Sequence, residues 1–289
     1  MTIAVVTDSS AYLPTHVAVR GRVFVVPLHV AVDGVSHDEG VDVSASDVAA
    51  ALREHRPVST SRPSPGAFLE VYEDLIARGV DQIVSIHLSR QMSATLASAE
   101  IAAASCDADV RVIDSESIGM AMGFAVLAAA GAVGDGATVD EVERIARDVA
   151  ARSHTYFYVD TLEYLRRGGR IGRASSLVGS ALSIKPLLTL TDGYIEPLER
   201  VRTTSKALAR LKSLARQAAV ELDSGDGVDV AVHHLDALER AEQLAEDLAE
   251  AVPDARRVLL VELGAAVGAH VGPGTIAVAV APRCRAPGA

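Results

Sequence analysis

The feature that most constrains the fold of this chain is an alternation of short apolar runs with helix-forming segments. Residues 3–7, 81–86 and 110–113 are short and apolar. A further strand is expected at 23–32, a hydroxyl-rich loop at 59–63, and helices at 46–55, 64–79, 94–104 and 139–152. Buried strands that alternate with helices are typical of parallel sheets. Residues 1–153 are therefore predicted to form a doubly wound, Rossmann-like α/β domain.

Hydroxyl and carboxylate side chains gather where these strands are expected to end. In an open parallel sheet, ligands bind beyond the carboxyl ends of the strands. The residues at those positions are Asp8, Ser9, Ser10, Thr60, Ser85, Ser89 and Ser93. Their side chains are therefore expected to converge on one site.

Ser93 lies at a predicted turn from strand to helix, in the segment 85–99. The small helix-forming residues that follow make Ser93 the expected N-cap of a helix. Unpaired amides, the serine hydroxyl and the helix dipole together form an anion site there. An ordinary structural cap explains the same residues, and this segment alone does not separate the two interpretations.

The second half of the chain follows a different pattern. Asp192-Gly193 between two apolar runs is a strong hairpin signal, which predicts antiparallel pairing of 185–191 with 194–201. Other strands are expected at 156–159, 228–233, 256–261 and 275–281, and helices at 161–167, 205–222 and 237–251. Residues 154–289 are therefore predicted to form a second, two-layer α/β domain with antiparallel strands.

Composition excludes several classes of partner. The net charge of −11 argues against nucleic acid or an anionic membrane surface, because both require a positive footprint. The apolar run 119–133 is too short to span a bilayer, and Cys106 and Cys284 form no C-x-x-C pair. No signal peptide is evident at the start of the chain, and a cytoplasmic protein is expected. Hydrophobic residues make up 49% of the chain but aromatic residues only 3%, so any cavity is expected to be aliphatic.

Common catalytic and metal-binding motifs do not match. P-loop, nucleophile-elbow and H-E-x-x-H patterns are absent from the sequence. His37-Asp38-Glu39 and His233-His234 are possible metal fragments, but a solvated loop and a strand end explain them better, and no metal is expected. His270 lies in the glycine-rich segment 264–274, which is expected to be a flexible link that brings backbone close to another group.

Over essentially its whole length the chain resembles the DegV family of bacterial fatty-acid-binding proteins. The motifs that carry the resemblance are 6–10 (VTDSS), 26–28 (VPL), 60–65 (TSRPSP), 88–95 (LSRQMSAT), 164–171 (YLRRGGRI), 201–202 (VR) and 270–275 (HVGPGT). The resemblance implies one long-chain fatty acid in a tunnel between two α/β domains. It places the carboxylate at Thr60 and Ser93, with Ser61, Ala94 and His270 close by.

The resemblance also implies a partner. In similar proteins a separate ATP-dependent fatty-acid kinase phosphorylates the bound acid for phospholipid synthesis. This chain is then expected to be a carrier with no cofactor beyond its fatty acid, and a candidate to hold the acyl phosphate formed. Arg202 matches the position implicated in docking the kinase.

Two positions depart from the family motifs. Arg62 replaces the glutamine of T-S-Q-P, and Ala94 replaces the glycine of L-S-G-T. Arg62 either adds a charge near the carboxylate or points to solvent. Ala94 adds a methyl group where the family lets a ligand approach the backbone.

Two enzymatic alternatives remain at this point. A serine hydrolase or acyltransferase would use Ser93 and His270 with a helix-start oxyanion site, but no third group that orients the histidine is identified. An enzyme for phosphorylated metabolites would use the arginine-glycine turn 166–173, which works equally well as a helix exit. The energetics suit a lipid: burying ~15 methylenes gains on the order of 12 kcal/mol gross, whereas each hydrogen bond to a carboxylate adds roughly 1.5 to 3 kcal/mol.

Overall fold

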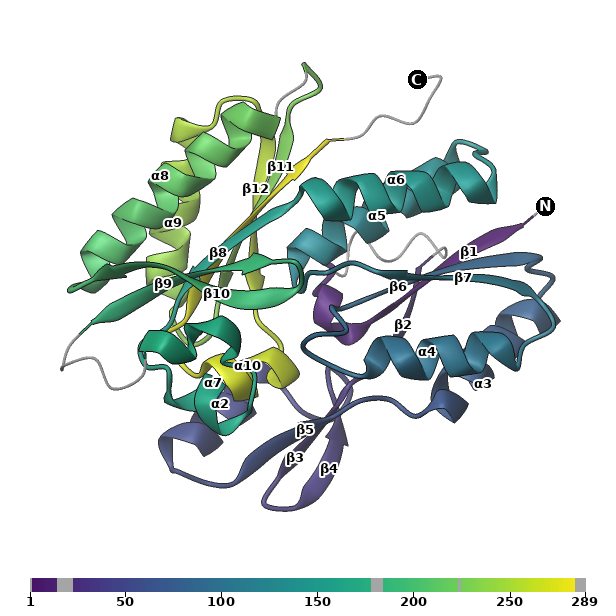
Figure 1. Cartoon of the computed structure of the whole chain (residues 1–289), viewed down its shortest axis with the longest axis horizontal. Coiled ribbons are helices and arrows are strands. Elements are labelled where there is room, and N and C mark those ends of the chain that lie inside the picture. Colours follow the sequence, from purple (N-terminus) through teal and green to yellow (C-terminus); the bar gives the residue numbers. More distant parts are fainter. Residues whose placement is uncertain (1, 15–22, 178–183, 223–224, 284–289) are drawn as a thin grey trace.

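The first half of the chain forms a four-stranded parallel sheet. The computed structural model describes residues 2–14, 23–177, 184–222 and 225–283. The strand order in this sheet is β2-β1-β6-β7. The strands are β1 (Ile3–Asp8), β2 (Val23–Val26), β6 (Gln82–His87) and β7 (Asp109–Asp114). The predicted parallel α/β sheet is confirmed (Figure 1).

Helices cover both faces of this sheet because alternate strand residues point to opposite sides. Val6 packs with α3 (Pro65–Ala77) and α4 (Thr95–Ala104) on one face. Val5 packs with α5 (Met120–Gly134) and α6 (Val139–Arg152) on the other. Thr138 and Glu141 form a capping box at the start of α6, which stabilises that helix end.

The second half forms a six-stranded mixed sheet with the order β10-β9-β8-β13-β11-β12. Its strands are β8 (His154–Tyr158), β9 (Lys185–Thr191), β10 (Tyr194–Val201), β11 (Val228–His234), β12 (Ala255–Glu262) and β13 (Ile276–Pro282). Among its described pairings, only that of β11 with β12 is parallel. The predicted hairpin at Asp192-Gly193 joins β9 to β10, so the expected antiparallel second sheet is confirmed.

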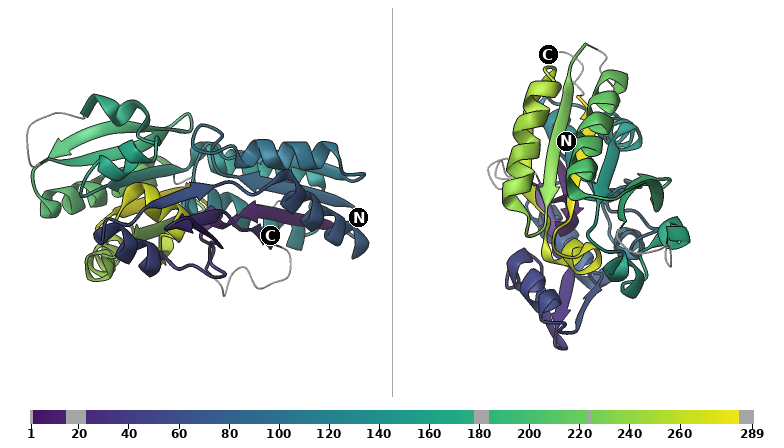
Figure 2. Two further views of the ribbon diagram at one scale, coloured as in Figure 1. Left: turned by 90° about the horizontal axis from the view of Figure 1, so that it is seen from below. Right: turned by 90° about the vertical axis from the view of Figure 1, so that its left-hand side faces the viewer.

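One face of the second sheet carries α8 (Thr204–Leu222) and α9 (Leu238–Ala251). Part of the opposite face packs on α5 and α6 through Ala231, Ala279 and Ala281. The two sheets consequently lie end to end along the molecule (Figures 1 and 2). The predicted boundary between residues 153 and 154 falls between α6 and β8.

A third, small sheet corrects two sequence-based expectations. Its order is β4-β3-β5, with β3 (His29–Val32), β4 (Val35–Asp38) and β5 (Val58–Ser61). The single strand predicted at 23–32 is wrong, because β2 and β3 belong to different sheets and are separated by Pro27, which cannot donate to a ladder. The loop predicted at 59–63 is also wrong in part, since Thr60 lies on β5 opposite Val30.

Short helices complete the fold. They are α2 (Ala45–Arg53), α7 (Glu163–Arg167), α10 (Ala265–Val271) and the 3-10 turns Ser9–Ala11 and Gly172–Leu177. Of these, α2 and α10 contact the small sheet. The flexible link expected at 264–274 is therefore largely a helix, because its alanines favour helix between terminal glycines. His233 and His234 are the last two residues of β11, which confirms the expected strand end, and both side chains are buried.

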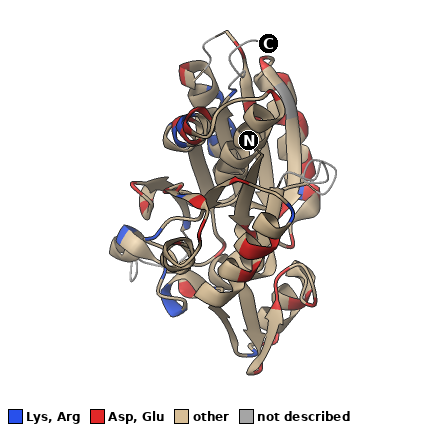
Figure 3. Ribbon diagram, turned by 90° about the vertical axis from the view of Figure 1, so that its right-hand side faces the viewer, with Lys and Arg blue, Asp and Glu red and all other residues tan. Residues whose placement is uncertain are grey.

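The surface agrees with an acidic chain. On the face drawn in Figure 3, Asp and Glu residues are spread over the helices and Lys and Arg residues lie among them without forming a continuous basic face. None of the described helices combines the length and apolarity needed to cross a bilayer. Cys106 is a partly exposed free thiol, and Cys284 lies outside the described residues.

Candidate functional site

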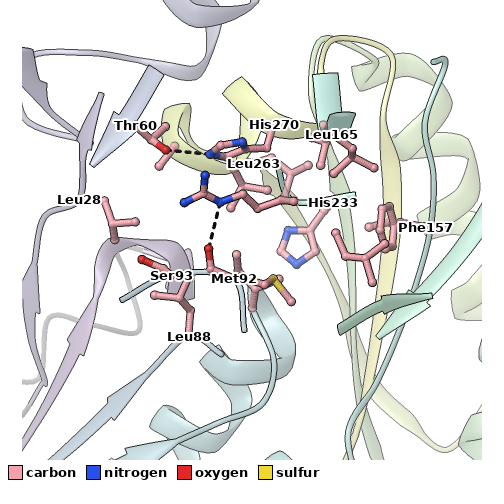
Figure 4. A pocket seen from close by; sticks show the side chains of 18 of the residues that line it. Leu28, Thr60, Leu88, Met92, Ser93, Phe157, Leu165, His233, Leu263 and His270 are labelled. Atoms are coloured by element: carbon pink, nitrogen blue, oxygen red, sulfur yellow. Dashed lines mark hydrogen bonds between the residues drawn. The ribbon is translucent and has the colours of Figure 1, made fainter. Parts of the chain in front are cut away.

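An apolar cavity lies between the two large sheets. The space between its walls, counted together with open solvent at its mouth, is about 940 Å³. Its apolar lining includes Leu28, Leu88, Met92, Ile118, Phe157, Leu165, Leu190, Ile195, Leu263, Val267, Val271 and Ala277. Its polar lining includes Thr60, Ser61, Arg62, Ser93, Thr155, Arg170, His233 and His270. Figure 4 shows Thr60 and Ser93 on one side, Phe157 on the other and His233 between them.

Thr60 and His270 meet across the two halves of the chain. Thr60 Oγ1 lies 2.7 Å from His270 Nε2, although the residues are 210 positions apart (Figure 4). Burial, with a smaller effect of the nearby Arg170 charge, lowers the pKa of His270 to about 4. The imidazole is therefore neutral near pH 7. If Nε2 carries its proton, His270 donates to Thr60 Oγ1 and leaves the threonine proton free for an anion.

The backbone of Gly168 packs directly against the His270 ring. A Cβ added at Gly168 would lie 2.0 Å from His270 Nδ1, so a side chain there would displace the ring. Nδ1 has no hydrogen-bond partner among the described residues. This agrees with a proton on Nε2, since Nδ1 then presents only a lone pair.

Ser93 lies just before α4, and the helix begins one residue later than predicted. The N-cap is Ala94, so the assignment of Ser93 as N-cap is wrong. Amides of Met92 and Ser93 bond to the Ser89 carbonyl at 3.0 and 3.1 Å, which adds a tight turn before the helix. Ser93 Oγ accepts the Thr95 amide at 3.2 Å and lies 2.8 Å from Thr95 Oγ1. The hydroxyl remains at the cavity wall.

A polar hollow adjoins the Thr60 and Ser93 end of the cavity. Its lining includes Ser61, Arg62, Ala94 and Arg170. Arg62 is exposed, and its Nε donates to the buried Ser98 Oγ at 3.0 Å. Ala94 borders only the outer hollow and not the inner cavity.

Arg170 is a site residue that the sequence reasoning missed. Its guanidinium donates to the backbone carbonyls of Met92 at 3.0 Å and Gly168 at 2.6 Å. No carboxylate within the described ranges forms an ion pair with Arg170 or Arg62. The arginine-glycine turn was the available signal, but a helix exit explained it equally well.

Glu39 and Tyr12 hold α10 in place and were also missed. Glu39 is 5% exposed and accepts a hydrogen bond from the Ala266 amide at 2.7 Å and another from Ser9 Oγ. Tyr12 Oη donates to Glu39 at 3.3 Å and accepts the Val267 amide at 3.3 Å. Burial, followed by the Asp8 charge, raises the pKa of Glu39 despite these hydrogen bonds. The interpretation of Glu39 as part of a solvated loop is therefore wrong.

Asp8 and His87 fix the turn that leads to Ser93. His87 Nδ1 lies 3.0 Å from Asp8, which also accepts the Leu88 amide at 3.1 Å. His87 Nε2 forms a second hydrogen bond, with Ser85 Oγ at 2.7 Å. Asp8, Ser85 and His87 are fully buried. None of them lines the cavity, so this chain of hydrogen bonds is structural.

Several hydrogen bonds join the two halves around the cavity. Ser89 Oγ donates to the Gly193 carbonyl at the tip of the β9–β10 hairpin at 3.0 Å. The Met120 amide at the start of α5 donates to His233 Nε2 at 3.0 Å. Together with the Thr60–His270 and Arg170–Met92 contacts, they hold the walls of the cavity in a fixed arrangement.

The geometry does not assemble a hydrolytic triad. Ser93 Oγ bonds to Thr95, and His270 Nε2 bonds to Thr60, so the serine and histidine are not paired. His270 Nδ1 meets no carboxylate in the described part of the chain. No group of three potential metal-ligating side chains occurs among the same residues.

Arg202 lies away from the cavity. It is exposed just after β10. The nearby Glu199 pairs with Arg210 at 2.6 Å and not with Arg202. No ion pair within the described ranges includes Arg202, so its guanidinium is available to contact another molecule.

Comparison with known proteins gives one consistent result. A family described as "Uncharacterised protein, DegV family" matches residues 2–283. A DegV domain-containing protein of Streptomyces coelicolor is 49% identical over 281 residues, covering 97% of this chain and 99% of the relative. A DegV family protein from Thermus thermophilus, described by its fatty acid binding, has TM-score 0.88 and 32% identity, covering 98% of this chain and 100% of that one.

A second solved structure agrees. DegV from Bacillus subtilis, described as a fatty acid binding protein, has TM-score 0.89 and 31% identity, covering 98% of this chain and 100% of that one. The match extends over both sheets and over the segments that carry Thr60, Ser93 and His270. This chain belongs to the DegV family.

Proposed function

We propose that this protein binds one long-chain fatty acid, with its tail in the apolar cavity and its carboxylate at Thr60 and Ser93. The observation that carries the proposal is an aliphatic cavity with the hydroxyl groups of Thr60, Ser61 and Ser93 at the end next to a polar hollow. Two DegV proteins with 31% and 32% identity to this chain are described as fatty-acid-binding. Burial of the tail supplies most of the affinity, and the hydroxyls set the orientation.

The head-group end offers donors without needing a paired cation. Thr60 donates when His270 Nε2 holds the imidazole proton, and the Ser93 hydroxyl can rotate from Thr95 toward the ligand. Ser61 and Ala94 also line the hollow. Arg170 adds a nearby positive charge that favours the ionised carboxylate.

We further propose a carrier role in which a separate ATP-dependent kinase phosphorylates the bound carboxylate. The carboxylate end would face the polar hollow, which leaves it open to a partner, while the tail stays buried. The partner would bring the ATP, so no cofactor other than the fatty acid is needed here, and both proteins would work in the cytoplasm. The acyl phosphate would then remain bound for phospholipid synthesis.

The hydrolase alternative has weaker support. It requires a serine activated by a histidine, and the pairing of His270 with Thr60 leaves Ser93 without that base. A carrier and a hydrolase also differ in turnover. A hydrolase would cleave an activated acyl ester at a rate that depends on Ser93, whereas a carrier would not.

Titration with saturated fatty acids of increasing length tests lipid binding. Each added methylene that enters the cavity is expected to improve binding by up to about 0.8 kcal/mol until the cavity is filled. One acid should bind per chain, and the methyl ester of the best acid should bind more weakly because it lacks the charge. Affinity that does not change with chain length would contradict burial of the tail.

Arg202→Ala tests the proposed kinase contact. The variant should keep its fatty-acid affinity but form less acyl phosphate with the cognate kinase and ATP. An interfacial charge of this kind is worth about 2 to 5 kcal/mol if buried and far less at a rim. Arg200→Ala is the matched control, because Arg200 is also an exposed arginine near the end of β10. Loss of lipid in Arg202→Ala, or kinase coupling equal to wild type at subsaturating carrier, would contradict the proposal.

A further inference from the structure

The polar hollow adjoins the cavity at the end where the carboxylate is proposed to bind. The residues that line both spaces are Thr60, Ser61, Arg62, Ser93 and Arg170. The hollow is therefore the space that lies directly beyond a carboxylate held by Thr60 and Ser93. A chemical group attached to that carboxylate would extend into the hollow.

The charge of the hollow is opposite to that of the whole chain. Arg62 and Arg170 line it, and no acidic residue is among the described residues of its lining. The chain itself carries a net charge of −11. Within the described ranges neither arginine forms an ion pair. Two guanidinium groups beside serine and threonine hydroxyls favour an anion with several oxygen atoms.

Arg62 is anchored to the protein through one nitrogen. Its Nε donates to Ser98 Oγ at 3.0 Å, and Ser98 is buried in α4. No other hydrogen bond of this guanidinium occurs in the described part of the chain, so both Nη groups can donate to a ligand. Arg170, by comparison, already uses Nε and Nη1 for the carbonyls of Met92 and Gly168. Arg62 is therefore the stronger candidate to bind an anion through two hydrogen bonds.

We propose that Arg62 makes the hollow a subsite for a phosphoryl group at the end of the bound chain, so that the ligand class includes acyl phosphates. A carboxylate has two oxygen atoms and one charge, which the hydroxyls of Thr60 and Ser93 can hold. A phosphoryl group brings three acceptor oxygens and up to two charges, and so requires donors beyond those hydroxyls. This inference rests on the proposed fatty-acid binding and adds the residue that distinguishes the phosphorylated acid from the free acid.

The test compares octadecanoic acid with octadecyl phosphate, a stable compound that carries phosphorus where octadecanoyl phosphate does. Displacement of a fluorescent fatty acid measures both affinities. Arg62→Gln introduces the glutamine of the family motif and removes the charge. It should weaken binding of octadecyl phosphate about tenfold more than binding of octadecanoic acid, which corresponds to one hydrogen bond to a charged group. Binding of octadecanoic acid also shows that the variant is folded.

Arg144→Gln is the matched control, because Arg144 is an exposed arginine on α6 that lines neither the cavity nor the hollow. It should leave the ratio of the two affinities unchanged. Inorganic phosphate at the concentration of octadecyl phosphate should displace neither compound, because the proposed phosphoryl group is held together with its chain.

Three results would overturn the inference and leave the proposed function in place. Arg62→Gln could change both affinities by the same factor, wild-type protein could bind octadecanoic acid but not octadecyl phosphate, or inorganic phosphate could displace octadecyl phosphate, which would assign the hollow to a free anion. If wild-type protein binds neither octadecanoic acid nor octadecyl phosphate, the proposed function itself fails.

Discussion

Ser93→Ala and Thr60→Ala are each expected to weaken fatty-acid binding by roughly 1 to 3 kcal/mol, about five- to 150-fold. Each variant removes one hydroxyl from the end of the cavity where the carboxylate is proposed to bind. Thr60→Ala also leaves His270 Nε2 without its partner. Equilibrium titration with one long-chain acid measures both effects, and thermal unfolding checks that the fold is intact.

The double variant should lose less than the two single effects together. Both side chains would contact one carboxylate, so removing the first partly undoes the second. Ser59→Ala is a suitable control, because Ser59 is an exposed serine on the same strand as Thr60 and lines neither the cavity nor the hollow. Unchanged affinity in both single variants would reduce Ser93 to a structural residue before α4.

Acid is expected to destabilise the ligand-free protein between pH 6.5 and 4 because of His233 and His270. Burial lowers the pKa of each to about 4, so in this window the unfolded state binds more protons than the folded state. Stability is therefore highest above pH 6.5 and falls as the pH drops. A decrease in pKa of this size corresponds to about 3 kcal/mol per histidine once both states are protonated. Glu39 acts in the opposite direction. Its pKa is raised in the folded state, so its contribution to folding stability is lost as the pH rises through the folded-state pKa.

Urea unfolding at a series of pH values measures this slope. His270→Asn should flatten it by up to one proton, whereas His55→Asn, which replaces an exposed histidine, should leave it unchanged. A slope that is the same in wild type and His270→Asn would show that folding does not lower the pKa of His270.

Local sequence signals were sufficient where one element determines its own structure. The apolar runs of β1, β6 and β7, the Asp192-Gly193 hairpin and the helix-forming run of α6 are each contained in a few neighbouring residues. The same holds for α3, which begins with Pro65 after the N-cap Ser64. These features gave the α/β class and the antiparallel second sheet.

Features that depend on distant residues were not predictable from local patterns. Helix α10 is held by Glu39, 227 positions from Ala266. Arg170 reaches the site through a carbonyl 78 positions away. Thr60 was placed in a loop because three hydroxyl residues in a row resemble a turn, yet pairing with β3 makes this segment a strand. The carboxylate-binding roles of Thr60 and Ser93 came from the family resemblance and remain predictions.

Native mass spectrometry of the protein purified without added lipid tests the central claim most directly. The account predicts a mass increase equal to one long-chain fatty acid per chain, with the acid released on denaturation and identified by its fragments. It also predicts that stripped protein takes up one equivalent of added long-chain acid. Protein that carries no lipid and fails to take up any added long-chain fatty acid would contradict the account.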